Sequence, residues 1–291
     1  MKNRRLKQEC IDLYDEFTHG TMSRRDFMDR LAMLAGGAAA AAALVPVLQN
    51  NYAEAGIVPE DDGRLTTETL TYRVDGTTMS GYLAHLTGDE KHPAVIVIHE
   101  NRGLNPHIKD VTRRMALEGF LAFAPDALSP VGGTPPDEDR AREMIYELDS
   151  EATVRHFTAA VPFLASHPLS SGKVGAVGFC WGGGMVNELA AAGTTLAAAV
   201  PYYGRQLPAD RVPEITTPLC LQYAGLDERI NAGIDDYVAA LKANGKTFEI
   251  FIYEGVNHAF NNDTNEARYN KEAADLAWGR TVEFLKRYLT E

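Results

Sequence analysis

The chain has 291 residues, of which 45% are hydrophobic and 23% are charged. This composition is typical of one or two globular domains with a sizeable core. The net charge of −12 argues against binding to nucleic acid or to anionic membranes. The three cysteines, Cys10, Cys180 and Cys220, have no metal-ligand spacing and are too few for a disulfide framework.

Residues 1–55 resemble an export signal. Residues 23–28 (SRRDFM) are similar to the twin-arginine motif, and residues 31–48 form a charge-free run rich in alanine. Residues 53–55 (AEA) then resemble a signal-peptidase cleavage site. This order predicts export of the folded protein to the periplasm or beyond. A membrane anchor is an alternative, although alanine and glycine give the run little apolar surface.

A third interpretation makes residues 1–55 an ordinary helical extension of a cytoplasmic protein. The segment before the motif is unusually long for a signal and has an amphipathic pattern. Its apolar helical face consists of Leu6, Cys10, Leu13, Tyr14 and Phe17. Residues 56–66 are polar and are predicted to form a linker.

Residues 67–291 carry the pattern of one α/β domain. Residues 67–74 and 79–86 alternate apolar and polar side chains around Asp75 and Gly76, which predicts an antiparallel hairpin. Continuous apolar runs then alternate with helical patterns, which is typical of a parallel sheet covered on both faces. The expected strands are 94–99, 120–124, the run around 174, 196–200, 218–224 and 247–253; the expected helices are 107–118, 139–148, 151–165, 185–192, 235–243 and one from 266 onward. We therefore predict a doubly wound, mostly parallel sheet with the hairpin at one edge.

Gly178, Cys180 and Gly182 form the pattern G-x-C-x-G between an expected strand and an expected helix. This is the nucleophile-elbow pattern with cysteine in place of serine. The two glycines are needed because such a turn brings backbone segments too close for a Cβ atom. The following helix N-terminus favours a thiolate. The alternative is a small buried cysteine in a glycine-rich turn.

Asp227 and His258 follow two later strands, so that the chain order is nucleophile, acid, base, as in α/β-hydrolases. His258 would take the thiol proton from Cys180, and Asp227 would orient the imidazole. Alternatively, Asp227 is only a helix N-cap and His258 an ordinary loop histidine. No role is predicted for the other histidines apart from His99, namely His19, His85, His92, His107, His156 and His167.

Glu100 follows the strand 94–99 and is an additional carboxylate that a plain triad does not need. It is either part of the site or a surface acid paired with Arg102. The neighbouring His99 is either an orienting residue or a core residue, and the sequence leaves this open.

Four segments together resemble the dienelactone hydrolase family of α/β-hydrolases, over about residues 67–289. They are 99–103 (HENRG), 178–183 (GFCWGG), 225–227 (GLD) and 257–260 (NHAF). The resemblance implies the triad proposed above. It also implies that Glu100 contacts the resting Cys180 thiol and sets its ionisation. The backbone N–H groups of Asn101 and Trp181 would form the oxyanion hole.

Two arginines that hold the substrate carboxylate in characterised family members have no counterpart here. The segment 125–130 (PDALSP) lacks the first, and Asn262 stands four residues after His258 in place of the second. Arg102 and Arg205 are candidates to replace them, and no substrate-binding residue is assigned. The resemblance therefore predicts acyl transfer of the carboxymethylenebutenolidase type, while the two missing arginines argue against a dienelactone as the substrate.

The expected function is hydrolysis of a small-molecule ester or lactone through a thioester acyl-enzyme. We expect no cofactor, no metal and no nucleic-acid partner, and no stable membrane span unless the N-terminal segment is retained. The oligomeric state is not predicted. The alternatives are a catalytically silent interaction protein on a hydrolase scaffold and a redox sensor that uses Cys180.

Overall fold

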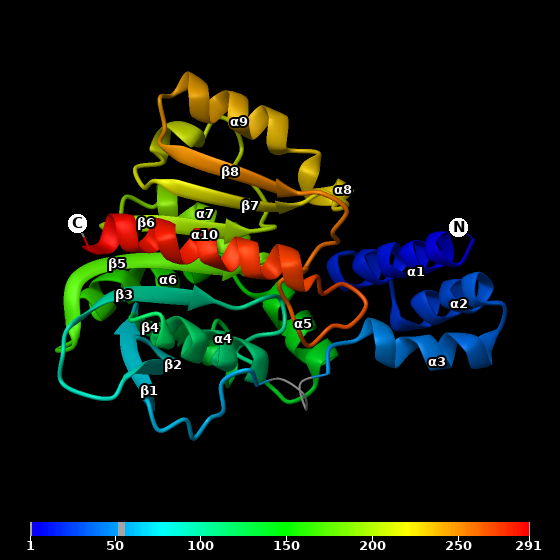
Figure 1. The fold of residues 1–291 in the computed structure, drawn as a ribbon, viewed down its shortest axis with the longest axis horizontal. Helices are drawn as coiled ribbons and strands as arrows, with labels where there is room; N and C mark the ends of the chain where they lie inside the picture. The colour runs from blue at the N-terminus through cyan, green and yellow to red at the C-terminus, as the bar shows by residue number, and fades with distance from the viewer. Residues whose placement is uncertain (1, 52–55, 291) are drawn as a thin grey trace.

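The computed structural model describes residues 2–51 and 56–290, so the predicted cleavage site at 53–55 lies outside the described residues. Figure 1 shows an α/β body and a separate group of three N-terminal helices on one side of it. The predicted linker is largely without regular structure, and the first strand begins at Leu65.

The body is built on one sheet of eight strands in the order β1-β2-β4-β3-β5-β6-β7-β8. The first two strands form the predicted antiparallel hairpin, and Asp75 and Gly76 in its turn have φ values of 49° and 80°. All neighbouring pairs from β4 to β8 are parallel, which confirms the predicted α/β-hydrolase architecture. The strands are β1 (Leu65–Val74), β2 (Thr77–Leu86), β3 (His92–Ile98), β4 (Leu121–Pro125), β5 (Ser170–Phe179), β6 (Leu196–Tyr202), β7 (Leu219–Ala224) and β8 (Phe248–Tyr253).

Helices cover both faces of the sheet. Ile96 and Ile98 of β3 pack in one core with α6, α7 and α9, whereas Val95 and Val97 pack in a second core with α4 and α10. This division follows from strand geometry, because successive side chains point to opposite faces. The helices of the body are α4 (Pro106–Leu117), α5 (Glu138–Glu147), α6 (Ser150–Ala165), α7 (Trp181–Ala191), α8 (Glu228–Asn231), α9 (Ile234–Ala243) and α10 (Lys271–Thr290), with short 3-10 turns at Ser129–Val131 and Val212–Glu214.

The last helix begins at Lys271, five residues later than the pattern predicts. The segment before it consists of turns held by asparagine side chains. Asn262 Oδ1 accepts from the N–H of Thr264, and Asn265 Oδ1 accepts from the N–H of Arg268. Such side chains compete with the helical hydrogen bonds of the backbone, which explains the late start.

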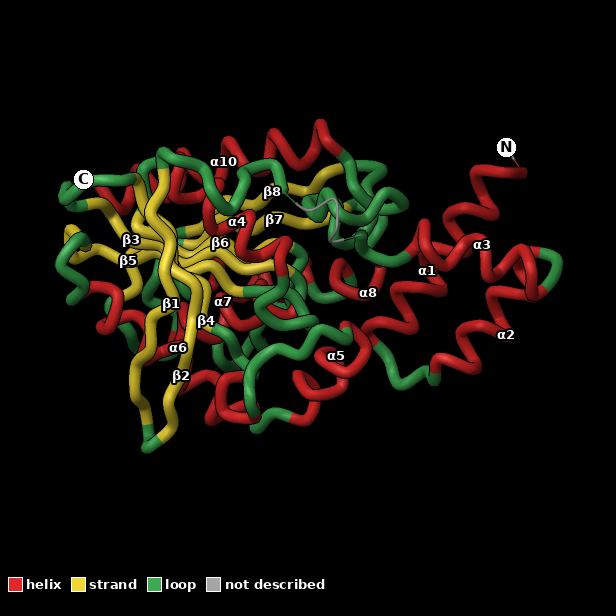
Figure 2. Tube along the Cα trace, turned by 90° about the horizontal axis from the view of Figure 1, so that it is seen from below, coloured by secondary structure: helices red, strands yellow, loops and turns green. Residues whose placement is uncertain are grey.

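The N-terminal helices α1 (Lys2–His19), α2 (Arg24–Ala35) and α3 (Ala38–Leu48) lie beyond the carboxyl ends of the parallel strands (Figures 1 and 2). They share a small core of their own, to which the body contributes Ala267. Within it the rings of Phe17 and Phe27 stack with centroids 4.7 Å apart. The predicted apolar face of α1 is therefore confirmed, and this face packs mainly against the other two helices.

The twin-arginine-like segment has structural roles in this unit. Ser23 Oγ accepts from the N–H of Asp26 and caps α2, and Phe27 is buried in the small core. Arg24 forms an ion pair with Asp139 at 2.6 Å. No single described helix is long and apolar enough to cross a membrane; α2 and α3 together reach that length and composition, with a bend of 110° between them.

Candidate active site

Cys180 occupies a sharp turn between β5 and α7. Its backbone has φ 56° and ψ −114°, which is a strained conformation for a residue with a side chain. A Cβ atom at Gly178 would lie 2.3 Å from the carbonyl oxygen of Gly182, and one at Gly182 would lie 2.4 Å from the carbonyl oxygen of His99. The turn therefore has the crowded geometry that the G-x-C-x-G pattern predicts.

Asp227 and His258 lie together behind this turn. His258 Nδ1 is 2.5 Å from Asp227 Oδ2, and the N–H of Ile230 donates to Asp227 Oδ1 at 3.1 Å. Asp227 is thus both the N-cap of α8 and the partner of His258, so the two sequence interpretations hold at once. The carboxylate fixes Nδ1 as the protonated nitrogen. His258 Nε2 is buried and has no hydrogen-bond partner among the described residues.

His19, the last residue of α1, also reaches the nucleophile. Its Nε2 lies 3.1 Å from Cys180 Sγ, and its ring packs edge-on against that of His258 with centroids 4.7 Å apart. Asp15 Oδ1 is 3.0 Å from His19 Nδ1. The expectation that His19 lies outside the site is wrong. That expectation was based only on residues that follow strands. His19 is instead the last residue of α1, a helix that packs against the α/β body.

The charges around Cys180 favour its thiolate. Burial alone raises the pKa of the thiol, but the imidazoliums of His19 and His258 outweigh it and lower the pKa to about 6. Burial lowers the pKa of His258, but the Asp227 carboxylate and the Cys180 thiolate raise it well above its usual range. Both shifts favour a thiolate–imidazolium arrangement over a neutral thiol and imidazole.

Glu100 is 5% exposed, and its Oε2 accepts from Asn262 Nδ2 at 2.8 Å. Asn262 stands where the family resemblance expects an arginine, so here that position holds the Glu100 carboxylate. The alternative that Glu100 is a surface acid paired with Arg102 is wrong, because Arg102 is also buried and pairs with Glu138. Direct control of Cys180 by Glu100 remains a prediction; the hydrogen bond of Cys180 Sγ runs to His19.

His99 is a core residue. The N–H of Ala127 donates to His99 Nε2 at 3.1 Å, so Nδ1 carries the proton and donates to the carbonyl of Glu100 at 2.6 Å. The ring stacks on Trp181 with centroids 5.3 Å apart and planes 9° apart. His99 therefore fixes the loop after β3 and the first residue of α7.

The predicted oxyanion-hole residues lie beside Cys180. Trp181 begins α7, and Asn101 lines a cavity of only about 10 Å³ together with Cys180 and His19. The side chain of Asn101 donates to the carbonyl of Thr18 at 3.0 Å and to the hydroxyl of Tyr146 at 3.1 Å. The loop that carries this predicted donor is thus tied to the end of α1.

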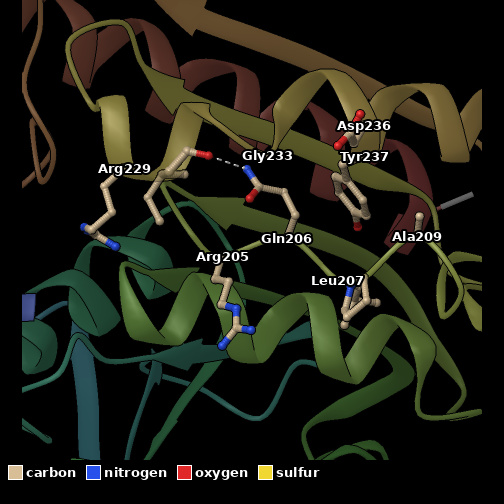
Figure 3. Close-up of a pocket in the computed structure, with 10 residues that line it drawn as sticks. Arg205, Gln206, Leu207, Ala209, Arg229, Gly233, Asp236 and Tyr237 are labelled. Atoms are coloured by element: carbon tan, nitrogen blue, oxygen red, sulfur yellow. Dashed lines mark hydrogen bonds between the residues drawn. The ribbon is translucent and has the colours of Figure 1, made fainter. Parts of the chain in front are cut away.

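A pocket of about 570 Å³ adjoins Cys180, which is a suitable volume for a small organic substrate. Arg205, Arg211 and Arg229 are on its rim, and Figure 3 shows Arg205 and Arg229 also bordering a neighbouring pocket of about 510 Å³. The apolar part of its wall consists of Ile145, Leu148, Val154, Trp181, Met185, Tyr203 and Ile230.

The three arginines of the pocket differ in their partners. Arg211 pairs with Glu188 at 2.6 Å, and Arg229 Nε lies 3.4 Å from Asp15 Oδ2. The exposed Arg205 guanidinium forms no ion pair with any residue that the structure describes. Of the two arginines suggested from the sequence, Arg205 therefore faces the pocket and Arg102 is held by Glu138.

One group of side chains could also hold a metal ion. The ligand atoms of His19, Cys180 and His258 lie within 4.8 Å of one another. Two imidazoles and a thiolate are a ligand set that Zn²⁺ accepts. The same three side chains could instead serve as an acid–base set, so chelation of metals is a direct test between the two uses.

Two family models match the chain. Residues 79–289 match the model described as the dienelactone hydrolase family, which covers nearly all of the α/β body. Residues 1–38 match a second model, described as YqhI-like, which covers α1 and α2. The second match ends where α3 begins, so it covers only part of the group of N-terminal helices.

Similar proteins agree with the first match. A Saccharolobus solfataricus protein named "Putative carboxymethylenebutenolidase" is 33% identical over 256 residues, covering 75% of this chain and 97% of that protein. A Methylorubrum extorquens protein of the same name is 28% identical over 292 residues, covering 95% of this chain and 97% of its own, and so extends into the N-terminal helices. The crystal structure of a "Putative Dienelactone Hydrolase" from Klebsiella pneumoniae superposes with a TM-score of 0.69 at 27% identity, covering 77% of this chain and 99% of that one.

Proposed function

Since the chain belongs to the dienelactone hydrolase family, we propose that it hydrolyses small-molecule esters or lactones with Cys180 as the nucleophile. The observation that carries the proposal is the position of Cys180. Its strained turn adjoins a substrate-sized pocket, and the buried His258–Asp227 pair lies directly behind it.

The first half of the reaction forms a thioester. The Cys180 thiolate attacks the substrate carbonyl, a C–S bond forms, and the carbonyl π pair moves onto oxygen. The backbone N–H groups of Asn101 and Trp181 stabilise this oxyanion. When the tetrahedral intermediate collapses, the ester C–O bond breaks and His258 gives its proton to the leaving oxygen.

The second half releases the acid. Neutral His258 now takes a proton from water, and the hydroxide attacks the thioester carbonyl. The C–S bond breaks, the thiolate re-forms, and Asp227 holds the imidazolium that results. A thiolate is a good leaving group, so esters and lactones are favoured over unactivated amides.

The pocket suggests the kind of substrate. Its wall is largely apolar, while the Arg205 guanidinium is exposed on its rim without an ion-pair partner among the described residues. We propose that the preferred substrate has an apolar body and an acidic group that reaches Arg205. This arrangement would replace the two arginines that the family resemblance leads one to expect.

A panel of nitrophenyl esters and lactones tests the reaction. Wild-type protein should hydrolyse members of the panel, and Cys180→Ala should reduce kcat by at least about 10³-fold. Cys220→Ala is the matched control, because Cys220 is buried inside β7 away from the turn and should leave kcat unchanged. Equal turnover by Cys180→Ala and wild type would end the proposal.

Export by the twin-arginine route is a second proposal, which rests on residues 23–28 and the apolar run that follows. Cleavage at residues 53–55 would remove His19, so this proposal excludes any role of His19 in the mature enzyme. Cell fractionation combined with N-terminal sequencing of the recovered protein tests this. A chain that begins at residue 1 or 2 and stays in the cytoplasm would rule export out.

A further inference from the structure

The end of α1 is packed into the catalytic site. The carbonyl of Thr18 accepts from Asn101, and His19 touches both Cys180 and His258. The remaining cavity at this contact is about 10 Å³, which is barely the volume of one water. The contact is thus closely packed, although it joins segments 161 residues apart in sequence.

We propose that His19 is a catalytic residue, a second imidazole that contacts the Cys180 thiolate beside His258. The N-terminal helices would then be a constituent part of the active site. This inference rests on the proposed function only in taking Cys180 as the nucleophile.

The surroundings of His19 resemble those of His258. A carboxylate oxygen lies near Nδ1 in each case, Asp227 Oδ2 at 2.5 Å and Asp15 Oδ1 at 3.0 Å, while the hydrogen bond of His19 Nδ1 goes to the main-chain carbonyl of Asp15 at 3.0 Å. Carboxylate contact at Nδ1 fixes the ring orientation and favours the charged imidazole. In both rings Nε2 is the nitrogen available to the thiolate; His19 Nε2 lies 3.1 Å from Cys180 Sγ, and the ligand atoms of His19, Cys180 and His258 all lie within 4.8 Å of one another.

Polar contacts from the body hold α1 in this position. Tyr14 accepts from Arg102 at 3.0 Å, the carbonyl of Phe17 accepts from Arg142 at 3.2 Å, and the Arg142 guanidinium lies 4.3 Å from the Phe17 ring centroid. Asp15 is near Arg229 on the other side. His19, Cys180 and His258 all line the pocket of about 570 Å³. The end of α1 is therefore part of the wall of the pocket, next to the nucleophile.

The charges at the site are consistent with two imidazoliums. Asp15, the Cys180 thiolate and Asp227 are negative, whereas His19, His258 and Arg229 are positive. The titratable and charged groups around Cys180 are His19 and Asp15 from α1, Glu100 and Arg102 after β3, Tyr146 from α5, Tyr203 after β6, Asp227 and Arg229 at α8, and His258 and Arg268 after β8.

His19 would act at both ends of the reaction without transferring a proton to substrate. In the resting enzyme its positive charge stabilises the thiolate that attacks. In deacylation the C–S bond breaks and the electron pair returns to sulfur, where the same charge stabilises it. His258 exchanges protons with the leaving oxygen and with water, and His19 keeps its own proton throughout.

Alkylation of Cys180 by iodoacetamide against pH tests the inference without any substrate. Burial raises the pKa of Cys220 to about 12, and that of Cys10 also lies above its usual value, so these thiols react little near neutrality. His19→Gln keeps a hydrogen-bond donor but removes the charge. Its alkylation midpoint should rise by about 1–2 pH units above that of wild type.

His92→Gln is the matched control, because His92 begins β3 at the opposite end of the strand from the site. Its alkylation midpoint should equal that of wild type. An unchanged midpoint in folded His19→Gln would overturn the inference. Faster ester turnover by His19→Gln would also overturn it, since His19 would then be an obstruction.

A second measurement keeps His19 unchanged, so the inference can still be tested if His19→Gln does not fold. The ring of His19 is followed by NMR in histidine-labelled wild type and in Cys180→Ser. Since coupling is reciprocal, removal of the thiolate should lower the pKa of His19 by about one unit or more. Identical titrations would contradict the inference. Neither measurement needs hydrolysis, so failure of the ester panel and failure of this inference are distinguishable.

Discussion

At the scale of single residues, Asp227 combines two roles that one substitution separates. Asn at this position can still cap α8 through its side-chain oxygen, but it cannot hold the His258 imidazolium. Asp227→Asn should therefore lower kcat by about 10³- to 10⁴-fold while Tm changes little. Asp137→Asn, at the N-cap of α5, is the matched control and should leave kcat unchanged. An unchanged kcat in Asp227→Asn would show that Asp227 acts only as a cap.

The ionisation of Cys180 predicts the acidic side of the pH profile. The thiolate is the reactive form, and its pKa is lowered to about 6 by the two imidazoliums against the effect of burial. Activity should therefore fall as the pH drops through about 6, because protonation removes the nucleophile. The measurement is kcat/KM against pH for a neutral ester. An acidic midpoint close to the ordinary thiol value of 9.0 would contradict the thiolate–imidazolium site.

Arg205 is expected to make the enzyme prefer esters that carry a carboxylate over neutral esters. Arg205→Gln should raise KM for an ester with a carboxylate by about tenfold, or about 1.4 kcal/mol, and change KM for a neutral ester little. Arg211→Gln is the control from the same pocket, since Arg211 is already paired with Glu188. Equal effects of Arg205→Gln on both esters would remove Arg205 from substrate recognition.

At the scale of elements, the packing of the small core of α1–α3 should determine whether His19 stays in contact with Cys180. Phe17 is buried there against Phe27, and Phe17→Ala should destabilise the three helices by about 3–4 kcal/mol. The alkylation midpoint of Cys180 should rise as His19 leaves. Met33→Ala, at a side chain that is 77% exposed on α2, should change neither property. Hydrogen exchange of α1 measures the first effect, and protection in Phe17→Ala equal to wild type would contradict it.

The strands, the hairpin and the turn at Cys180 could be predicted because each depends on a local pattern. The glycines at positions 178 and 182 indicate a tight turn at Cys180. Asp227 and His258 each follow a parallel strand, and the carboxyl ends of these strands lie at the same edge of the sheet. The docking of α1 could not be predicted in this way. It depends on contacts such as Tyr14 with Arg102 and Asp15 with Arg229, which join distant segments through polar atoms. The only hint in the sequence was the spacing of four residues between Asp15 and His19, which lets a carboxylate contact an imidazole on one helix face. This spacing points to the active site only once α1 is known to pack beside Cys180.

At the scale of the whole molecule, the site is shared between the α/β body and the N-terminal helices. The α/β body supplies Cys180, Asp227 and His258, and the N-terminal unit supplies His19. Both contribute charges that balance without a cation. Treatment with EDTA followed by desalting should therefore leave ester turnover unchanged. A loss restored by Zn²⁺ would instead identify His19, Cys180 and His258 as metal ligands.

If Cys180 is the nucleophile, its sulfur forms a thioester with the acyl group of the substrate during each turnover. Rapid acid quenching of a reaction with an activated ester, followed by intact-mass and peptide mass spectrometry, measures this directly. We expect an added acyl mass on the peptide that contains Cys180, present during turnover and absent in Cys180→Ala. Steady hydrolysis with no acyl mass on that peptide, undiminished in Cys180→Ala, would contradict it.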